Sequence, residues 1–532
     1  MKNVGLKFSM IIITAIMVFF GCQSPVNKVI TIEGSVNSWL EEMTISQLQQ
    51  GYKEGKFTVK QVVAGYIARI EAIDKNGPKL NSLIIVNPDA LQIAEELDKE
   101  IKEGKIRGPM HGVPVILKDN IDTHDRMPAT AGATALRNSF PLKDSFIAKK
   151  LREAGAVIIA KSNLSEWANF RADNSSSGWS GVGGQTKNPY VLDRNPCGSS
   201  SGSGAAVSAN LGMMAIGTET DGSIVCPSNN NGVVGIKPTV GLLSRTGIIP
   251  ISFTQDTPGP MGRTVEDAAI CLGALTGIDS TDSKTLASKG KSLTDYTLYL
   301  KKDGLKGKRI GLLKDEMGFS AKVDTLIKLA VSYMKSKGAE VIEIETPKNQ
   351  GYGSASYQVL LYEFKDGVNK YLSGLGESAP VKNLEELIEF NKKDTVELRW
   401  FDQKIFEKAQ KKGDLETPEY KKALAKMLKA TREEGIDKMM NINNLDALIA
   451  PTGSPAWKTD LILGDHFVGG NSSLAAISGY PAITVPMGFV ENLPVGVTFF
   501  GRAWSEPTLI EIAYSYEQGT RHRKAPKYLI TD

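Results

Sequence analysis

Short apolar runs alternate with helical patterns along most of the chain. Apolar positions at helical spacing predict helices within residues 45–73, 90–101 and 323–334. Mostly apolar runs of three to five residues predict buried strands at residues 113–117, 156–160, 309–313, 341–344, 447–450 and 483–485. The strand, helix and strand between residues 309 and 344 make one βαβ unit. The alternation therefore predicts an α/β fold.

Two stretches depart from this alternation. Residues 384–440 are charged and helical, which predicts a solvated helical insertion. Residues 161–260 are rich in Gly, Ser, Thr and Asn, and such a stretch usually builds a site because its backbone is permissive and its hydroxyls are reactive. The sequence contains no internal repeat and no linker. Its length of 532 residues does not by itself decide the number of domains.

The first 22 residues have the layout of a secretory signal. Lys2 and Lys7 precede an uncharged run from Met10 to Phe20, which is too short to span a bilayer as a helix. The Gly21-Cys22 pair that follows resembles a bacterial lipobox, in which Cys22 becomes the lipidated N-terminus. We expect an exported lipoprotein on the periplasmic or cell-surface side, attached to the membrane through this lipid anchor only. A plain signal peptide, with secretion, and an uncleaved anchor are the alternatives.

Composition removes several classes of function. The 63 Lys+Arg nearly balance the 59 Asp+Glu, which argues against nucleic acid as a partner. Removing Cys22 leaves Cys197, Cys226 and Cys271, an odd and sparse set that predicts small buried residues rather than disulfides. The sequence has no metal-binding or nucleotide-binding motif, so we expect no metal and no cofactor.

A serine motif in the Gly/Ser-rich stretch permits one misleading reading. Residues Gly198 to Gly202 satisfy G-x-S-x-G, the nucleophile elbow of α/β-hydrolases. A Ser-His-Asp site would then need His466 or His522, because no other histidine follows. His522 stands in a basic run typical of a solvated helix end, and His466 stands in a loop-like stretch. We keep His466 as the candidate of this disfavoured alternative.

A lysine and two serines make the better constellation. Lys118 ends a buried apolar strand, and burial lowers a lysine pKa enough to make the amine a base near neutral pH. Ser199 lies in Gly198-Ser199-Ser200-Ser201-Gly202, and Ser223 follows Asp221-Gly222 in the same Gly/Ser-rich stretch.

Several motifs in order resemble the amidase signature family of serine hydrolases. They are Gly112 to Asp119, Lys161 to Ala168, Gly198 to Gly204, Thr218 to Val225, Gly235 to Gly241 and Asp256 to Thr264. The resemblance implies a single large domain with a central mixed β-sheet surrounded by α-helices. We place this amidase domain at residues 45–525, after a signal at 1–22 and a mature N-terminal segment at 23–44.

The resemblance also implies the role of each motif residue. Ser223 aligns with the nucleophile, Ser199 with a bridging serine after a cis peptide bond, and Lys118 with the base that draws protons through Ser199. The backbone N–H groups of Thr220, Asp221, Gly222 and Ser223 align with the oxyanion hole. The implied reaction is hydrolysis of R-CO-NH2 to the acid and ammonia through an acyl-serine.

The motif around Ser223 departs from the usual family pattern of Asp-Thr-Gly-Gly-Ser-Ile-Arg. Glu219 replaces the Asp, Asp221 replaces the first Gly, and Val225 replaces the Arg. This variant resembles the branch that contains bacterial peptide amidases, which act on peptide C-terminal amides. Residues 283–445 show no clear match, so the sequence leaves their part in substrate choice open.

Three other functions remain as alternatives. One is the A-type subunit of a glutamine-dependent amidotransferase, although an exported protein would not meet its cytosolic tRNA partners. A second is a binding lipoprotein that keeps the fold without catalysis, which the joint presence of Lys118, Ser199 and Ser223 disfavours. A nitrilase-type site at Cys197 or Cys226 lacks the expected Glu and Lys neighbours.

Overall fold

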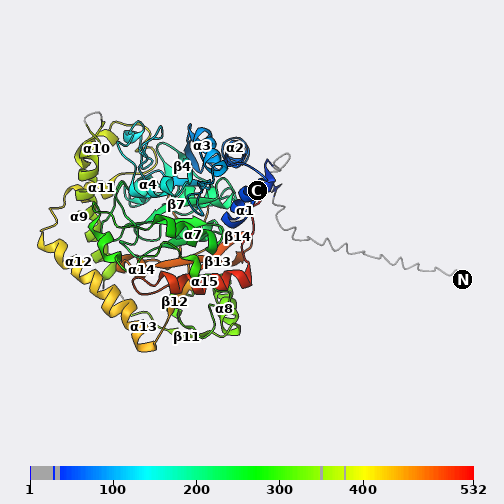
Figure 1. Cartoon of the computed structure of the whole chain (residues 1–532). Coiled ribbons are helices and arrows are strands. Elements are labelled where there is room, and N and C mark those ends of the chain that lie inside the picture. Colours follow the sequence, from blue (N-terminus) through cyan, green and yellow to red (C-terminus); the bar gives the residue numbers. More distant parts are fainter. Residues whose placement is uncertain (2–27, 30–35, 348–350, 377–378, 532) are drawn as a thin grey trace.

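The computed structural model describes Met1 and residues 28–29, 36–347, 351–376 and 379–531. Cys22 and the rest of the expected signal from residue 2 lie outside the described residues. Within the described part, one mixed sheet of eleven strands crosses the molecule and helices surround it (Figure 1). The predicted fold, a large α/β domain with a central mixed sheet, is therefore confirmed.

The sheet combines two parallel sets with antiparallel strands between them, and one edge strand is also antiparallel to its neighbour. In spatial order its strands are β11 (Glu340–Ile344), β10 (Arg309–Leu313), β12 (Ala447–Pro451), β14 (Leu493–Phe500), β13 (Ala482–Val490), β8 (Val234–Lys237), β9 (Thr257–Gly262), β7 (Met214–Glu219), β3 (Pro114–Lys118), β4 (Val157–Ser162) and β2 (Leu83–Val86). β3 is parallel to both of its neighbours, and so is β10.

Most predicted elements are present, with small shifts at their ends. The helices are α1 (Ile45–Lys53), α2 (Val59–Arg69), α3 (Ala90–Lys102), α4 (Phe146–Glu153), α5 (Ser201–Ser208), α6 (Val225–Asn230), α7 (Val265–Leu275), α8 (Ala321–Ser336), α9 (Tyr352–Ser373), α10 (Leu384–Asn391), α11 (Lys404–Gln410), α12 (Pro418–Thr431), α13 (Asp437–Asn443), α14 (Ser473–Ser478) and α15 (Glu506–Thr520). The predicted βαβ unit is β10-α8-β11, whose two strands pair in parallel.

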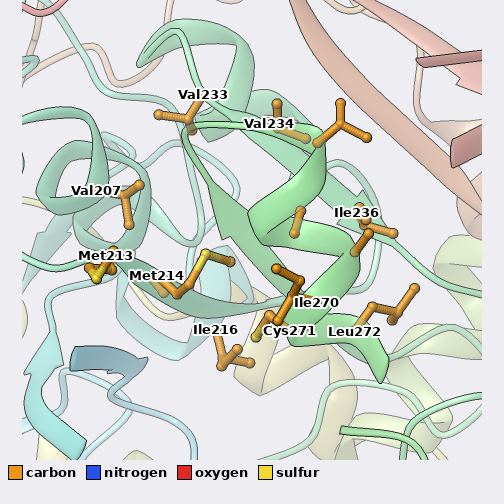
Figure 2. Close-up of a cluster of buried hydrophobic side chains, with 14 of the residues drawn as sticks. Val207, Met213, Met214, Ile216, Val233, Val234, Ile236, Ile270, Cys271 and Leu272 are labelled. Carbon is orange, nitrogen blue, oxygen red and sulfur yellow. The ribbon is translucent and has the colours of Figure 1, made fainter. Parts of the chain in front are cut away.

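The main core packs helices against the central strands. Figure 2 shows Met214 and Ile216 of β7 in one apolar cluster with Ile270 and Cys271 of α7, to which Val234 and Ile236 of β8 also belong. Cys271 is buried in this cluster as a free thiol, as predicted. This packed apolar layer therefore holds β7 and β8, two of the strands that carry site motifs, in place.

The region 384–440 differs from the predicted solvated insertion. Its helices α10 and α11 bury Leu384, Leu387 and Phe406 in a second apolar cluster with Phe364 of α9. α12 also packs against α9 (Figure 1). The charged side chains of α10, α11 and α12 are exposed while apolar positions of the same helices are buried, so the helices belong to the body of the domain.

Packed structure extends beyond residues 45–525 at both ends. Leu40 is fully buried in the main core, and β1 (Lys28–Val29) pairs with β15 (Leu529–Ile530). In the described ranges, no helix is both long enough and apolar enough to cross a membrane.

Candidate active site

Lys118 reaches the site from the middle of the parallel strands. It is the last residue of β3, and its side chain is fully buried. Its Nζ donates to Ser199 Oγ at 2.7 Å, to Thr218 Oγ1 at 2.9 Å and to the Thr218 carbonyl at 3.2 Å. Thr218 lies in β7, the neighbour of β3. Sheet pairing thus aims the amine at Ser199.

Burial weakens the hold of Lys118 on its proton. The pKa of Lys118 falls to about 7, because the buried ammonium has lost its water. The carboxyls of Asp256 and Glu219 act in the opposite direction, but burial is the larger effect. A lysine with this pKa is a base that works near neutral pH.

Ser199 stands at the start of a buried helix. The Gly198–Ser199 peptide bond is cis, and α5 begins two residues later. Gly198 is required there, because a Cβ would lie 2.1 Å from Ser165 Oγ. The Ser199 carbonyl accepts from the Ser165 N–H at 3.0 Å, which ties this turn to the loop after β4.

The Ser223 loop, residues 220–223, has free backbone N–H donors. None of the N–H groups of residues 220–223 donates to an acceptor within the described ranges. The next two, of Ile224 and Val225, donate to the buried carboxyl of Glu219 at 2.7 and 3.0 Å. Gly222 has φ +83°, a left-handed conformation that suits glycine. The loop can therefore offer its free donors to a developing negative charge.

The two serine loops meet through their backbones. The Ser200 N–H donates to the Ser223 carbonyl at 3.2 Å. Of the relay implied by the resemblance, the structure contains the bond from Lys118 to Ser199. No hydrogen bond joins the Ser199 and Ser223 hydroxyls in the described ranges. Such contacts often tighten only when substrate binds.

A disulfide joins the segment before Ser199 to the helix that follows Ser223, which corrects the prediction that these cysteines only pack. Cys197, two residues before Ser199, is bonded to Cys226 in α6, with 5.9 Å between their Cα atoms. The odd count misled, because one bonded pair and the buried Cys271 together make three. The pairing depends on tertiary approach, which sequence spacing does not show. Neither Cys197 nor Cys226 is available as a thiol nucleophile.

A pocket of about 310 Å³ opens over this disulfide. Its lining includes Gly198, Asp221, Gly222 and both bonded cysteines. The remaining lining residues are Asn169, Ser177, Val225, Thr452, Trp457, Asp465, Phe467, Gly470, Asn471, Ser472 and Ser473. Two acidic side chains and no Lys, Arg or His stand in this lining.

The rim segment, residues 457–473, is a part of the site that the sequence reasoning missed. Asp465 fixes it by accepting from the Ser177 N–H at 2.9 Å and from Trp457 Nε1 at 3.1 Å. Ser472 and Ser473 donate to the two carboxylate oxygens of Asp221 at 2.6 and 2.8 Å. The run Gly469-Gly470-Asn471-Ser472-Ser473 is rich in Gly and Ser, as is the segment around Ser199, and this was the available signal.

The rim also presents exposed apolar side chains. Ile462, Leu463, Phe467 and Val468 are each more than half exposed. His466 Nε2 lies 3.1 Å from Asp460 on this surface and is not in the pocket lining, so the Ser-His-Asp alternative has no geometric support.

Comparison with known proteins identifies the family of this chain. The sequence model of the family described as Amidase matches residues 61–510. A probable amidase of Arabidopsis thaliana is 42% identical over 501 residues, which cover 92% of each chain. The native peptide amidase of Stenotrophomonas maltophilia has 46% identity and a TM-score of 0.88, over 92% of this chain and 99% of that one.

An amidotransferase relative is also found. The A-type subunit of the glutamyl-tRNA(Gln) amidotransferase of Microcystis aeruginosa is 33% identical over 506 residues, covering 91% of this chain and 99% of the relative. The family match spans most of the chain, and the sheet, helices and motif order are those expected from the resemblance. This chain belongs to the amidase family, the amidase signature hydrolases that act on carbon–nitrogen bonds of linear amides.

Proposed function

We propose that this protein hydrolyses carboxamides to acids and ammonia through an acyl-Ser223 intermediate. Lys118 is the base, Ser199 the proton relay and Ser223 the nucleophile, while the N–H groups of residues 220–223 form the oxyanion hole. The observation that carries this assignment is the buried Lys118 amine, with a pKa of about 7, placed 2.7 Å from Ser199 Oγ.

Each chemical step follows from these positions. Neutral Lys118 takes the proton of Ser199 as Ser199 takes that of Ser223, and Ser223 Oγ bonds to the amide carbon. The carbonyl electron pair moves to the oxygen, where the free N–H groups stabilise it. As the C–N bond breaks, the proton returns through Ser199 to the leaving nitrogen. Water then repeats the attack on the acyl-serine.

Peptide C-terminal amides are the substrate class we propose. The support is the 46% identical peptide amidase and the apolar rim, where Phe467 and its exposed neighbours offer contact area for side chains upstream of the amide. We expect the peptide chain that leads to the amide to lie against this rim.

A glutaminase activity of the amidotransferase type is the second candidate, favoured only by the 33% identical amidotransferase relative. Free glutamine carries an α-carboxylate close to its side-chain amide. The described pocket lining offers that carboxylate no cation and places Asp221 and Asp465 nearby. Carboxylates repel one another and no cation of this lining offsets the repulsion, so we expect glutamine to be the poorer substrate.

Ammonia release distinguishes these functions. The mature domain is expected to release ammonia from a neutral peptide C-terminal amide with kcat/KM at least about tenfold above that for free glutamine, since the pocket lining repels a nearby carboxylate. A simple aliphatic amide and an anilide complete the panel, and enzyme with Ser223→Ala is the blank.

Each outcome of the panel has a meaning. Release from the aliphatic amide or anilide alone would keep the amidase chemistry and reject the peptide preference. Glutamine as the best substrate would favour the second candidate. No serine-dependent release from any amide would support a non-catalytic binding role.

We further propose that the protein is exported and carries a lipid on Cys22. Support comes from the basic start, the uncharged run and the Gly21-Cys22 pair. The Cys197–Cys226 disulfide fits an oxidising compartment. In a bacterial host that processes lipoproteins, Cys22→Ser is expected to move the protein from the membrane fraction to the soluble exported fraction and to abolish labelling by a radioactive fatty acid. Unchanged labelling would contradict the proposal.

A further inference from the structure

In the Ser223 loop, backbone carbonyls accept hydrogen bonds, whereas the backbone N–H groups have no acceptor within the described ranges. Gln255 Nε2 donates to the Thr220 carbonyl at 3.1 Å, and the carbonyls of Gly222 and Ser223 accept from the N–H groups of Cys226 and Ser200. The N–H groups of the same residues have no acceptor within the described ranges. The protein therefore holds this loop by its carbonyls and leaves its N–H donors free, and Asp221 and Gly222 of the loop line the pocket.

The contact to Thr220 fixes a particular peptide plane. In a planar trans peptide the carbonyl and the following N–H point in opposite directions. Because Gln255 holds the Thr220 carbonyl from the buried side, the Asp221 N–H must point away from Gln255, and Asp221 lines the pocket. Asp256 grips the same residue, accepting from Thr220 Oγ1 at 2.6 Å. Two adjacent side chains thus set the rotation of this plane.

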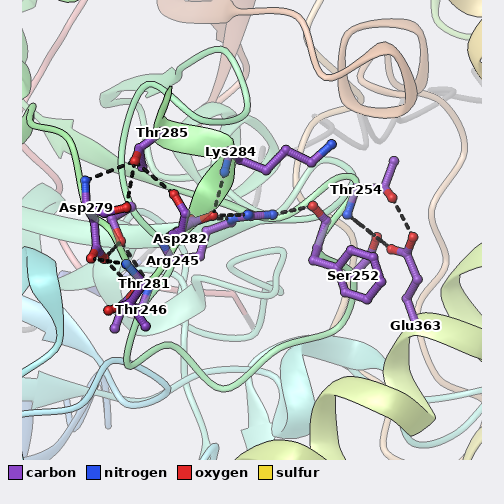
Figure 3. A network of polar contacts seen from close by, with 12 residues as sticks. Arg245, Thr246, Ser252, Thr254, Asp279, Thr281, Asp282, Lys284, Thr285 and Glu363 are labelled. Carbon is purple, nitrogen blue, oxygen red and sulfur yellow. Dashed lines mark hydrogen bonds and ion pairs between the residues drawn. The ribbon is translucent and has the colours of Figure 1, made fainter. Parts of the chain in front are cut away.

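Gln255 and Asp256 belong to a bracing loop, residues 251–256, which is itself held rigidly. Figure 3 shows Glu363 of α9 meeting Ser252 and Thr254, and Arg245 linking the loop to Asp282. The Thr254 N–H donates to Glu363 Oε2 at 3.1 Å, and the Arg245 guanidinium donates to the Phe253 carbonyl.

Helix α9 also contacts Gln255 directly. Ser356 Oγ of α9 donates to Gln255 Oε1 at 2.7 Å, which fixes the amide so that its NH2 faces Thr220. Gln255 is fully buried, and its own N–H donates to the Ser252 carbonyl. An unbroken chain of hydrogen bonds therefore runs from α9 through Gln255 to the Ser223 loop.

We infer that Gln255, oriented by Ser356 of α9, is a positioning residue that sets the direction of the Asp221 N–H in the oxyanion hole. This inference rests on the proposed function. It assigns a role in the reaction to α9, within the region whose contribution the sequence left open. Gln255 does not touch the substrate, and it acts only through the Thr220–Asp221 peptide.

The chain offers a matched control in Gln403. That glutamine is also buried, its Nε2 donates to the Ile388 carbonyl at 3.1 Å, and its Oε1 accepts from Asn391 Nδ2 at 3.1 Å. Gln255→Leu and Gln403→Leu thus remove the same kinds of bond. A general loss of stability affects both variants, whereas loss of oxyanion geometry affects only the first.

The test compares kcat, KM and two inhibitors on the preferred amide. A peptide aldehyde bonds its carbonyl carbon to Ser223 Oγ and places its oxygen in the oxyanion hole, with the serine proton passing to the relay. The matching peptide alcohol binds without forming this bond. Gln255→Leu is expected to lower kcat at least about tenfold and to weaken the aldehyde by a similar factor, because a misplaced oxyanion donor acts on the tetrahedral state. KM and alcohol binding should change less than about threefold.

Two results would overturn the inference. One is a kcat for Gln255→Leu within twofold of that for Gln403→Leu. The other is an equal weakening of aldehyde and alcohol. If Gln255→Leu does not fold, Ser356→Ala is tested in its place. A threefold or larger fall in kcat with a matching loss of aldehyde affinity supports the positioning role of Gln255. Unchanged values reject that role. Wild-type enzyme inactive on every amide would instead refute the proposed function.

Discussion

Ser223→Ala is expected to lower kcat for the preferred amide by about 10⁴-fold or more, with the fold intact. The substitution removes the oxygen that forms the acyl-enzyme, and the residual rate comes from binding and the oxyanion hole alone. Within the described ranges the Ser223 hydroxyl makes no hydrogen bond, so its loss costs little stability.

Kinetics and thermal unfolding together check this expectation. The control is Ser228→Ala in α6, because Ser228 is a buried serine five residues further on whose hydroxyl has no partner in the described structure. It should keep the wild-type rate. If Ser223→Ala retained more than a few per cent of turnover, Ser223 would not be the nucleophile.

Lys118→Met is expected to reduce kcat/KM about 10³-fold. Methionine has a similar length but no amine, so Ser199 loses its base. The expected loss follows because general base catalysis contributes about 10²–10⁴-fold to a rate. Lys161→Met is the control, since Lys161 is a fully buried lysine of the adjacent strand β4 whose Nζ donates to the Ile121 carbonyl. Per folded molecule, this control should keep most of its activity. Equal losses in the two variants would assign the effect to stability.

The same lysine sets the pH dependence of the wild-type enzyme. Catalysis needs neutral Lys118, so with a pKa of about 7 the rate should be level above neutrality and fall as pH decreases through 7. Below pH 6, kcat/KM should drop roughly tenfold per pH unit. A profile that stays flat down to about pH 4, in protein still folded by circular dichroism, would exclude a lysine base.

Ordered motifs made the family and the fold predictable. The apolar runs before Lys118 and at residues 309–313 are strands because β-strands buried on both faces read as continuous apolar segments. The prediction that Lys118 ends such a strand needed no tertiary information. That its amine lies beside Ser199 came from the family resemblance, since the two residues are far apart in sequence.

Contacts between distant segments were not predictable in the same way. The disulfide, the rim segment and the Gln255 contact each join parts of the chain that no local pattern relates. The charged residues that dominate the sequence of residues 384–440 predict solvated helices. Their few apolar positions, such as Leu387 and Phe406, nevertheless suffice to build a buried face.

The Cys197–Cys226 bond also closes a covalent ring that contains two of the three catalytic residues. It joins residues 29 apart and closes a ring that holds Ser199, Ser223, α5 and β7, while Lys118 stays outside. Closing such a ring removes about 3–4 kcal/mol of conformational freedom from the denatured chain. In the unfolded chain the disulfide therefore keeps Ser199 and Ser223 within one ring, whereas nothing holds Lys118 near them. Activity returns only when β3 inserts again between β4 and β7.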